Sequence, residues 1–272
     1  MPRRPLTPSR AVLVVVVAGL VVAGCGSGGS GASDPSLSDA AGTAPALTGT
    51  VTVSAAASLT DAFEAIGGDF EAANLDVTVD LNLGSSGTLA TQIEEGAPVD
   101  VAAFADEATM ARLVDGGLVA GTSEVFATNQ MIVVTKPGNP RNVTALADLA
   151  DAGTISLCVD TAPCGAFADQ ILETAGVVIP ESDVTRGRDV KATLGAVTEG
   201  DADAAIVYVT DAEVSGDAVD VVAIPPEHDV IARYPVAVVE GAADEALARA
   251  FVAYVLGPEA RAVLEEAGFR AP

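Results

Sequence analysis

The sequence contains no tryptophan, and aromatic residues make up only 4% of its 272 positions. Half of the residues are hydrophobic, so alanine, valine, leucine and isoleucine must form most of any core. A chain of this length is long enough for two domains of ordinary size. The shortage of aromatic rings argues against a sugar-binding site built from stacked rings.

Basic residues are also scarce, since 13 lysines and arginines stand against 38 aspartates and glutamates, for a net charge of −25. This balance argues against nucleic acid as a partner, because neutralising its phosphates requires clustered lysine and arginine. The one histidine in the sequence, His228, lies in "PPEHDV", a stretch typical of a turn. A Ser-His-Asp triad would therefore depend on a residue whose surroundings predict an exposed loop.

The N-terminal segment predicts export from the cytoplasm. Three arginines within the first ten residues precede an apolar run, residues 11–23, which is too short for a membrane-spanning helix of about 20 residues. Residues 1–24 therefore indicate a signal peptide, and "VAGC" at its end resembles the lipobox of bacterial lipoproteins. The resemblance implies cleavage before Cys25 and a lipid on its sulfur; an ordinary signal peptide with a chance cysteine is the alternative. Residues 25–48, rich in glycine, serine and alanine, predict a flexible tether.

The other two cysteines, Cys158 and Cys164, lie within "LCVDTAPCG". In an exported protein such a pair can persist as a disulfide, and we expect a local disulfide here. A metal site is the rival interpretation, but no histidine is near and the spacing is not that of a CxxC pair.

From residue 50 onward, strand-like and helical patterns alternate, which predicts an α/β fold with largely parallel sheets. The strand-like runs cover residues 51–54, 77–81, 99–104, 126–135, 154–159, 204–208, 219–224 and 231–239. The helical runs cover residues 60–73, 88–95, 107–115, 166–175, 190–199, 244–256 and 258–266.

Two strand-like stretches, around residues 128–135 and 234–239, are long enough to cross between two lobes. We therefore expect a substrate-binding domain over residues 49–272 that is made of two α/β lobes. The first lobe would comprise approximately residues 49–128 and 236–272, and the second approximately 129–235. A ligand would bind in the cleft between them, at turns that lead from strands into helices.

Three such turns carry small or hydroxyl-bearing residues: "AAASLT" around Ser58, "LGSSGT" around Ser86 and "APCGA" around Cys164. The first N–H groups of a helix have no partner inside the helix, and the helix end carries a partial positive charge. Small neighbours would let an oxyanion approach these donors. The alternative is that Ser58, Ser86 and Thr88 simply cap their helices. No glycine-rich phosphate loop with its lysine is present, so a nucleotide site is disfavoured.

Four motifs resemble, in order, the molybdate-binding proteins of bacterial ABC transporters. They are "AAASLTDAF", "GSSGTLATQIEEGAPVDVAAFAD", "AIVYVTDA" and "YPVAVVEG", and the similarity extends from about Thr50 to Phe269. The resemblance implies the type II periplasmic-binding-protein fold, whose two α/β lobes close on a tetrahedral oxyanion, molybdate or tungstate. It also implies that hydrogen bonds hold the anion without positively charged side chains.

The same resemblance implies five ligand-binding positions. Ser58 and Ser86 would each offer a hydroxyl and a backbone N–H, Val190 in "RDVKATL" a backbone N–H, and Tyr208 its phenol hydroxyl. The fifth position falls on Cys164, where many members carry alanine and use the backbone N–H, so the side-chain change need not remove the contact.

Gly87 interrupts the serine run of the second motif and removes one possible hydroxyl, which we expect to lower affinity or to shift the choice of ligand.

These features predict a lipid-anchored extracytoplasmic protein that captures molybdate or tungstate and delivers it to an ABC transporter permease and its ATPase. We expect a monomer on the outer face of the cell membrane, with no catalysis, no cofactor and no protein ligands to a metal. The first alternative is the same fold binding sulfate, phosphate or another small anion. The second is a secreted hydrolase with Ser58 or Ser86 as nucleophile, for which Lys136 and Lys191 are the remaining bases. The third is an interaction protein without a ligand.

Overall fold

One sheet runs through residues 46–272, the part of the chain that this computed structural model describes. Its nine strands in these residues are β1 (Gly49–Ala56), β2 (Val77–Gly84), β3 (Val101–Ala103), β4 (Glu124–Thr135), β5 (Ile155–Cys158), β6 (Val184–Gly187), β7 (Ala204–Tyr208), β8 (Asp220–Val222) and β9 (Ile231–Val238). They follow the spatial order β2, β1, β3, β9, β4, β7, β5 and β6, and β8 pairs with β4.

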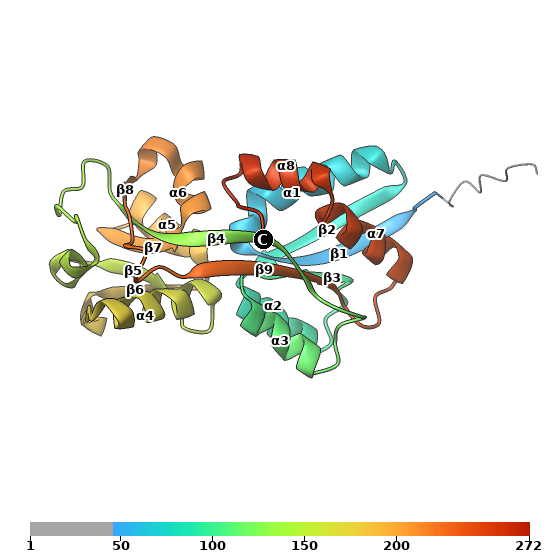
Figure 1. Ribbon diagram of the computed structural model, residues 1–272, viewed down its shortest axis with the longest axis horizontal. Helices are drawn as coiled ribbons and strands as arrows, with labels where there is room; N and C mark the ends of the chain where they lie inside the picture. The colour runs from blue at the N-terminus through green and yellow to red at the C-terminus, as the bar shows by residue number, and fades with distance from the viewer. Residues whose placement is uncertain (1–45) are drawn as a thin grey trace, which may run out of the picture. The chain divides into compact units, whose positions relative to one another are not determined.

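Helices connect the strands and cover the sheet (Figure 1). The α-helices are α1 (Thr60–Ala73), α2 (Ser86–Glu94), α3 (Glu107–Asp115), α4 (Pro163–Ala175), α5 (Val190–Thr198), α6 (Val209–Ser215), α7 (Glu245–Val255) and α8 (Pro258–Glu266). The 3-10 helices are Ala57–Leu59, Leu146–Asp151, Glu181–Asp183 and Gly216–Ala218.

The long strands β4 and β9 divide this sheet into two lobes, which confirms the predicted fold class. The first lobe contains β1–β3, with α1, α7 and α8 on one side and α2 and α3 on the other (Figure 1). The second lobe contains β5–β8 with α4, α5 and α6. β4 pairs with β9 at its first half and with β7 and β8 at its second half, so the chain crosses from lobe to lobe along this pair.

The prediction of largely parallel strands is correct within the lobes and wrong at the crossing. β1 is parallel to β2 and β3, and β5 is parallel to β6 and β7. β4 and β9 are antiparallel to each other and to their other neighbours. The reason is topological: β4 carries the chain into the second lobe and β9 brings it back, so the two must run in opposite directions.

Most of the aromatic residues form one connected set of ring contacts, which begins under α1 and α7. In α1 the buried side chains include Phe63, Ile66 and Phe70, whose spacing of three and four residues puts them on one helix face. Phe63 lies 5.8 Å from Phe126 and Phe70 lies 5.2 Å from Phe251, between ring centroids.

Because the described residues form one unit with its own core, they can be studied without the preceding segment.

The segment before this unit carried several predictions. The signal peptide over residues 1–24, the lipidation of Cys25 and the tether as far as residue 45 lie outside the described residues. In residues 46–272, no helix is both long enough and apolar enough to cross a membrane.

Candidate functional site

A small cavity of about 10 Å³ lies between the two lobes, and all five predicted ligand-binding residues line it. The first lobe contributes Ser58 and Ser86; the second contributes Cys164, Val190 and Tyr208. The remaining lining residues are Ala56, Ala57, Gly84, Ser85, Ala105, Ala162, Pro163 and Asp189. Most of these side chains are small, so backbone atoms make up much of the wall.

Each of the five residues stands at the start of a helix or turn that follows a strand. Ser58 lies in the 3-10 turn after β1, and α1 begins two residues later at Thr60. Ser86 and Val190 are the first residues of α2 and α5, and Cys164 is the second residue of α4. Tyr208 ends β7 directly before α6. The three alanines after Ser54 therefore leave room around a turn of N–H groups, as expected.

The backbone N–H groups of Ser58, Ser86, Cys164 and Val190 donate to no other atom in the part of the chain that the structure describes. Such groups lack intrahelical partners by position, and their partial positive charge favours an anion. In α5, Asp189 accepts a hydrogen bond from the Ala192 N–H at 2.8 Å, which leaves the Val190 N–H free to face the cavity.

The alternative that the serines only cap their helices is wrong for this structure. No side chain caps α1, α2 or α4, whereas aspartates cap α3, α5 and α7. Thr88 is exposed and lines no part of the cavity. Of the helices whose first turn faces the cavity, α1, α2 and α4 thus have no side-chain cap, whereas α5 has one.

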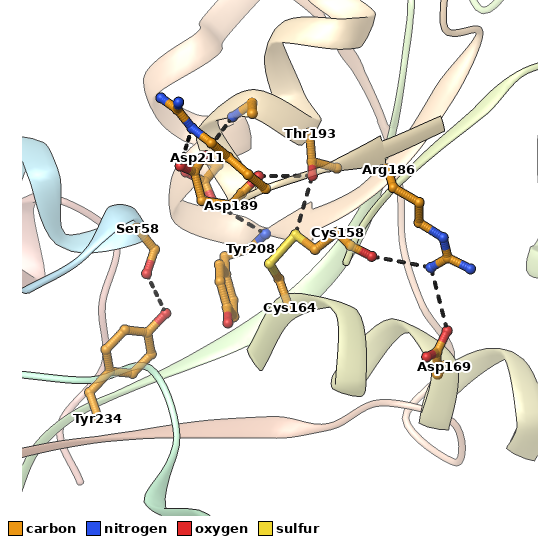
Figure 2. The surroundings of a disulfide bond; sticks show 12 residues. Ser58, Cys158, Cys164, Asp169, Arg186, Asp189, Thr193, Tyr208, Asp211 and Tyr234 are labelled. Carbon is orange, nitrogen blue, oxygen red and sulfur yellow. Dashed lines mark hydrogen bonds and ion pairs between the residues drawn. A yellow bond between two sulfur atoms is a disulfide. The ribbon is translucent and has the colours of Figure 1, made fainter. Parts of the chain in front are cut away.

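Two serine hydroxyls in the wall each have one hydrogen-bond partner in the protein. The Ala105 N–H donates to Ser86 Oγ at 3.0 Å. Ser58 Oγ lies 3.0 Å from the hydroxyl of Tyr234 in β9, a fully buried residue (Figure 2). If Tyr234 donates to Ser58, the Ser58 proton can point at an anion.

Two further hydroxyls in the wall, those of Tyr208 and Ser85, are buried and have no hydrogen-bond partner within residues 46–272. An unsatisfied buried hydroxyl costs about 1–3 kcal/mol, so these groups fit a cavity whose ligand accepts hydrogen bonds. Burial raises the pKa of the Tyr208 phenol well above its ordinary value, so the group is a neutral donor. Figure 2 shows the hydroxyls of Ser58, Tyr208 and Tyr234 near one another.

No lysine or arginine lines the cavity among the described residues, so its donors are neutral. The carboxylate in the wall, Asp189, has both oxygens engaged: one accepts from Ala192 and the other pairs with Arg188 at 3.3 Å. A wider groove nearby is lined by Asp106, Glu107 and Asp160; Arg233 also lines it but is paired with Glu107 at 3.1 Å, so the uncompensated carboxylates would repel an anion. The candidate anion site is therefore the small cavity with its neutral donors, although the acidic groove is larger.

A disulfide joins Cys158, the last residue of β5, to Cys164 at the start of α4 (Figure 2). It ties the Cys164 N–H to the end of the strand. The Thr193 hydroxyl, which lies 2.9 Å from the Asp189 carbonyl oxygen, also contacts Cys158 Sγ at 3.2 Å, and Arg186 donates to the Cys158 carbonyl at 3.1 Å. This part of the wall is thus fixed by covalent and polar contacts.

Gly87 has a role that the sequence did not reveal. A side chain at this position, on α2 of the first lobe, would collide with the carbonyl oxygen of Thr161 in the second lobe. The interpretation that Gly87 merely lacks a hydroxyl is therefore incomplete, because the missing side chain lets the two lobes approach each other.

Other residues near the cavity were not predicted. Tyr234 was visible in "YPVAVVEG", but no spacing rule links it to Ser58, 176 positions away. His228 lies in a turn as expected, but it is half-buried rather than exposed, and it lines no part of the cavity.

Lys191, a candidate base from the sequence, forms an ion pair with Asp61 at 2.8 Å. Burial lowers the pKa of Lys191, but its bonds to Asp61 and Asp211 outweigh this effect and leave the pKa raised, the opposite of what a general base needs.

Two α/β lobes that meet over a pocket of neutral donors define a solute-binding protein. The chain belongs to the bacterial extracellular solute-binding protein family, whose model matches residues 51–270. It is 38% identical to the molybdate-binding protein ModA of Mycobacterium tuberculosis over 262 residues, 96% of each chain.

Two solved structures resemble the protein in fold. The periplasmic molybdate-binding protein of Azotobacter vinelandii matches with a TM-score of 0.72 and 22% identity, over 82% of this chain and 99% of that one. The sulfate-binding protein SubI of Mycobacterium tuberculosis matches with a TM-score of 0.73 and 22% identity, over 83% and 87%.

Proposed function

We propose that this protein captures molybdate or tungstate outside the cytoplasm and delivers it to the permease and ATPase of an ABC transporter. The observation that carries the proposal is the cavity itself, where neutral N–H and O–H donors from both lobes converge. The 38% identity to a molybdate-binding protein along nearly the whole chain supports the choice of cargo.

In this proposal Ser58, Ser86 and Tyr208 donate from their hydroxyls, and Ser58, Ser86, Cys164 and Val190 donate from their backbone N–H groups. A smaller tetrahedral anion would not reach all of these donors at once. Each buried donor left unmet costs about 1–3 kcal/mol, which selects for size. Neutral donors also hold the anion without a charge-assisted arginine clamp, so the cargo can be released.

Closure of the lobes follows from donors that lie on both sides of the cleft. An anion that contacts both lobes binds the closed conformation more tightly than the open one, and it therefore shifts the population toward closure. The closed form would be the one that the permease recognises.

The protein would act without covalent chemistry and without a cofactor. A hydrolase using Ser58 or Ser86 would need a base, and Lys191 is held charged by its ion pair with Asp61, with a raised pKa. Lys136 does not line the cavity.

The proposal includes a signal peptide over residues 1–24, a lipid on Cys25 and a tether to the domain that begins near residue 49, with the protein acting as a monomer at the outer face of the membrane. The support is the sequence pattern around Cys25. Mass spectrometry of the protein from cell membranes would detect a diacylated Cys25 at the N-terminus; an N-terminus elsewhere would contradict the anchor.

Sulfate is the second candidate cargo, since a sulfate-binding protein shares the fold and neutral donors suit any oxyanion. A thermal shift panel separates the two. At a concentration 100 times the dissociation constant, a ligand stabilises by about 2.7 kcal/mol, or roughly 5–10 °C for a domain of this size. We expect this shift with molybdate and tungstate. A shift with sulfate alone would change the cargo, and no shift with any oxyanion would favour an interaction protein.

A further inference from the structure

An ion pair joins the two lobes beside the cavity. Lys191 in α5, on the second lobe, places its Nζ 2.8 Å from a carboxylate oxygen of Asp61 in α1, on the first lobe. The same Nζ lies 3.6 Å from Asp211 in α6. Among the ion pairs within residues 46–272, Lys191–Asp61 is the one that links a helix of one lobe to a helix of the other.

Each member of this cluster shares a turn with a residue proposed to bind the anion. Asp61 follows Ser58 by three positions, and Lys191 follows Val190 directly. Asp211 follows Tyr208 by three positions, and its Oδ2 accepts the Tyr208 N–H at 3.3 Å (Figure 2). A displacement of either lobe would therefore move the ion pair and the anion donors together.

We propose that Lys191 is a latch residue, which forms its bond to Asp61 only when the lobes close and which thereby slows release of the bound oxyanion. This inference rests on the proposed function, since it concerns how the same cavity holds its cargo. Lys191 is a positioning residue in this account: it does not line the cavity, and it contributes through closure.

The contacts of Lys191 explain why this bond can favour closure. Asp211 is almost fully buried, with 1% of its side chain exposed, and it belongs to the same lobe as Lys191. It keeps the ammonium group near the cleft in either conformation. Asp61, with 52% of its side chain exposed, can then approach a cation that is already oriented, so little side-chain freedom is lost on closure.

The close approach of the lobes at Gly87 and Thr161 is a second interlobe contact, and it supports closure around the cavity independently of charge. A backbone carbonyl of the second lobe occupies the place of a side chain on α2 of the first lobe. The latch and this contact lie on elements that also supply Ser58, Ser86 and Cys164 to the cavity. Interlobe contacts thus surround the anion donors on more than one side.

The test compares Lys191→Gln and Asp61→Asn with a matched pair inside one lobe, Arg112→Gln and Glu94→Gln. Arg112 and Glu94 form an ion pair of 2.7 Å between α3 and α2. Residues 46–272 of each variant would be loaded with radiolabelled molybdate, and release would be followed by rapid filtration after mixing with excess unlabelled molybdate, a readout that needs no tryptophan.

We expect the two latch variants to release molybdate roughly 3- to 10-fold faster, with a smaller change in the association rate, as for a partly shielded ion pair. The double variant should lose no more than the larger single loss, because each single change already breaks the bond. The Arg112 and Glu94 variants should stay within about twofold of the unmodified protein.

Lys191→Arg keeps the charge and should restore most of the slow release, which a general loss of stability would not predict. Release rates for Lys191→Gln and Asp61→Asn equal to those of the control pair would overturn the latch while leaving the proposed function intact. If the unmodified protein fails to bind molybdate, the proposed function fails instead. If Lys191→Gln does not fold, the exposed Asp61→Asn decides the matter.

Discussion

Tyr208 is the lining residue whose side chain most clearly lacks a hydrogen-bond partner among residues 46–272. Its hydroxyl is buried, lines the cavity and makes no hydrogen bond within residues 46–272. We predict that Tyr208→Phe weakens molybdate binding roughly 10- to 100-fold, because a hydrogen bond to a charged group contributes about 1.5–3 kcal/mol. The ligand-free protein should unfold at the same or a higher temperature, since an unsatisfied hydroxyl is removed. Isothermal titration and thermal unfolding check both statements.

The matched control for this change is Tyr254→Phe, because Tyr254 lies in α7 against Phe70 and lines no part of the cavity. Equal affinity of the Tyr208 and Tyr254 variants would contradict the role of the phenol as a donor.

Tyr234 should affect anion binding indirectly, through the hydroxyl of Ser58. We predict that Tyr234→Phe weakens molybdate binding about 3- to 10-fold, in line with about 0.5–1.5 kcal/mol for a neutral hydrogen bond. The reason is orientation: without the Tyr234 donor, the Ser58 hydroxyl can turn its proton away from the anion. In a Ser58→Ala background the same change should have little further effect, and an additive loss measured by titration would count against this coupling.

At the scale of the element, the start of α2 depends on the absence of a side chain at Gly87. We predict that Gly87→Ala lowers molybdate affinity by roughly tenfold or more, because a methyl group there meets the Thr161 carbonyl and reduces the population of closed protein. Titration measures the loss, and small-angle scattering with molybdate should show a more open form.

Gly68→Ala is the matched control, since Gly68 lies in α1 with open space where the methyl group would go. It should leave affinity unchanged and stabilise the protein by about 0.5–1 kcal/mol, as expected for glycine in a helix. A Gly87 variant with normal affinity would show that the lobes need not approach so closely.

The disulfide at the start of α4 leads to a second prediction at this scale. Replacing both Cys158 and Cys164 by serine should lower the free energy of unfolding by about 2 kcal/mol, the value expected for so short a loop. Urea unfolding measures this loss. Molybdate affinity should also fall, because the Cys164 N–H is no longer fixed to the end of β5. Unchanged affinity with reduced stability would show that the disulfide only stabilises the fold.

Most elements could be predicted from the sequence, because local periodicity and turn residues decide them. The helices Thr60–Ala73, Glu107–Asp115 and Pro258–Glu266 and the strand Ala204–Tyr208 have the predicted bounds. The start of α4 was placed three residues late, although proline suits the first helical position. β6 (Val184–Gly187) was missed because this strand is largely exposed and shows no hydrophobic alternation, and α6 was missed because it is short and polar.

The candidate site was predictable in part for the same reason. Its five residues lie at or shortly after the end of a strand, where a turn or helix begins, so a local pattern and a family resemblance could locate them. Their partners could not be predicted, because Tyr234 and Ser58 are 176 positions apart and Lys191 and Asp61 are 130 apart. Such contacts depend on how the two lobes meet, which no local pattern encodes.

At the scale of the whole molecule, stability should depend on pH through Asp211. Burial raises the pKa of its carboxyl to about 7, while Lys191 and the Tyr208 N–H oppose the shift and Asp61 adds to it. Tyr234 also lies close enough for its own pKa to be raised by Asp211, after the larger effect of burial. Between pH 4 and 7 the folded protein keeps a proton that the unfolded chain has lost, so stability falls as pH rises through this window.

The expected loss is at most about 1.4 kcal/mol for each pH unit in that window, and it levels off above pH 7. Urea unfolding at several pH values, compared between the unmodified protein and Asp211→Asn, isolates this contribution from the other carboxylates. The variant should lose less stability between pH 5 and 7 than the unmodified protein. Parallel curves would mean that Asp211 titrates at its ordinary pKa.

The most direct test of the account is isothermal titration of residues 46–272 with molybdate, tungstate, sulfate and phosphate at physiological salt. The account predicts saturable one-to-one binding of molybdate and tungstate, weakened by Tyr208→Phe and Ser86→Ala, with far weaker binding of sulfate and phosphate. Tight binding of sulfate or phosphate in place of molybdate would contradict the assigned cargo, and binding of none of the four would contradict the oxyanion site itself.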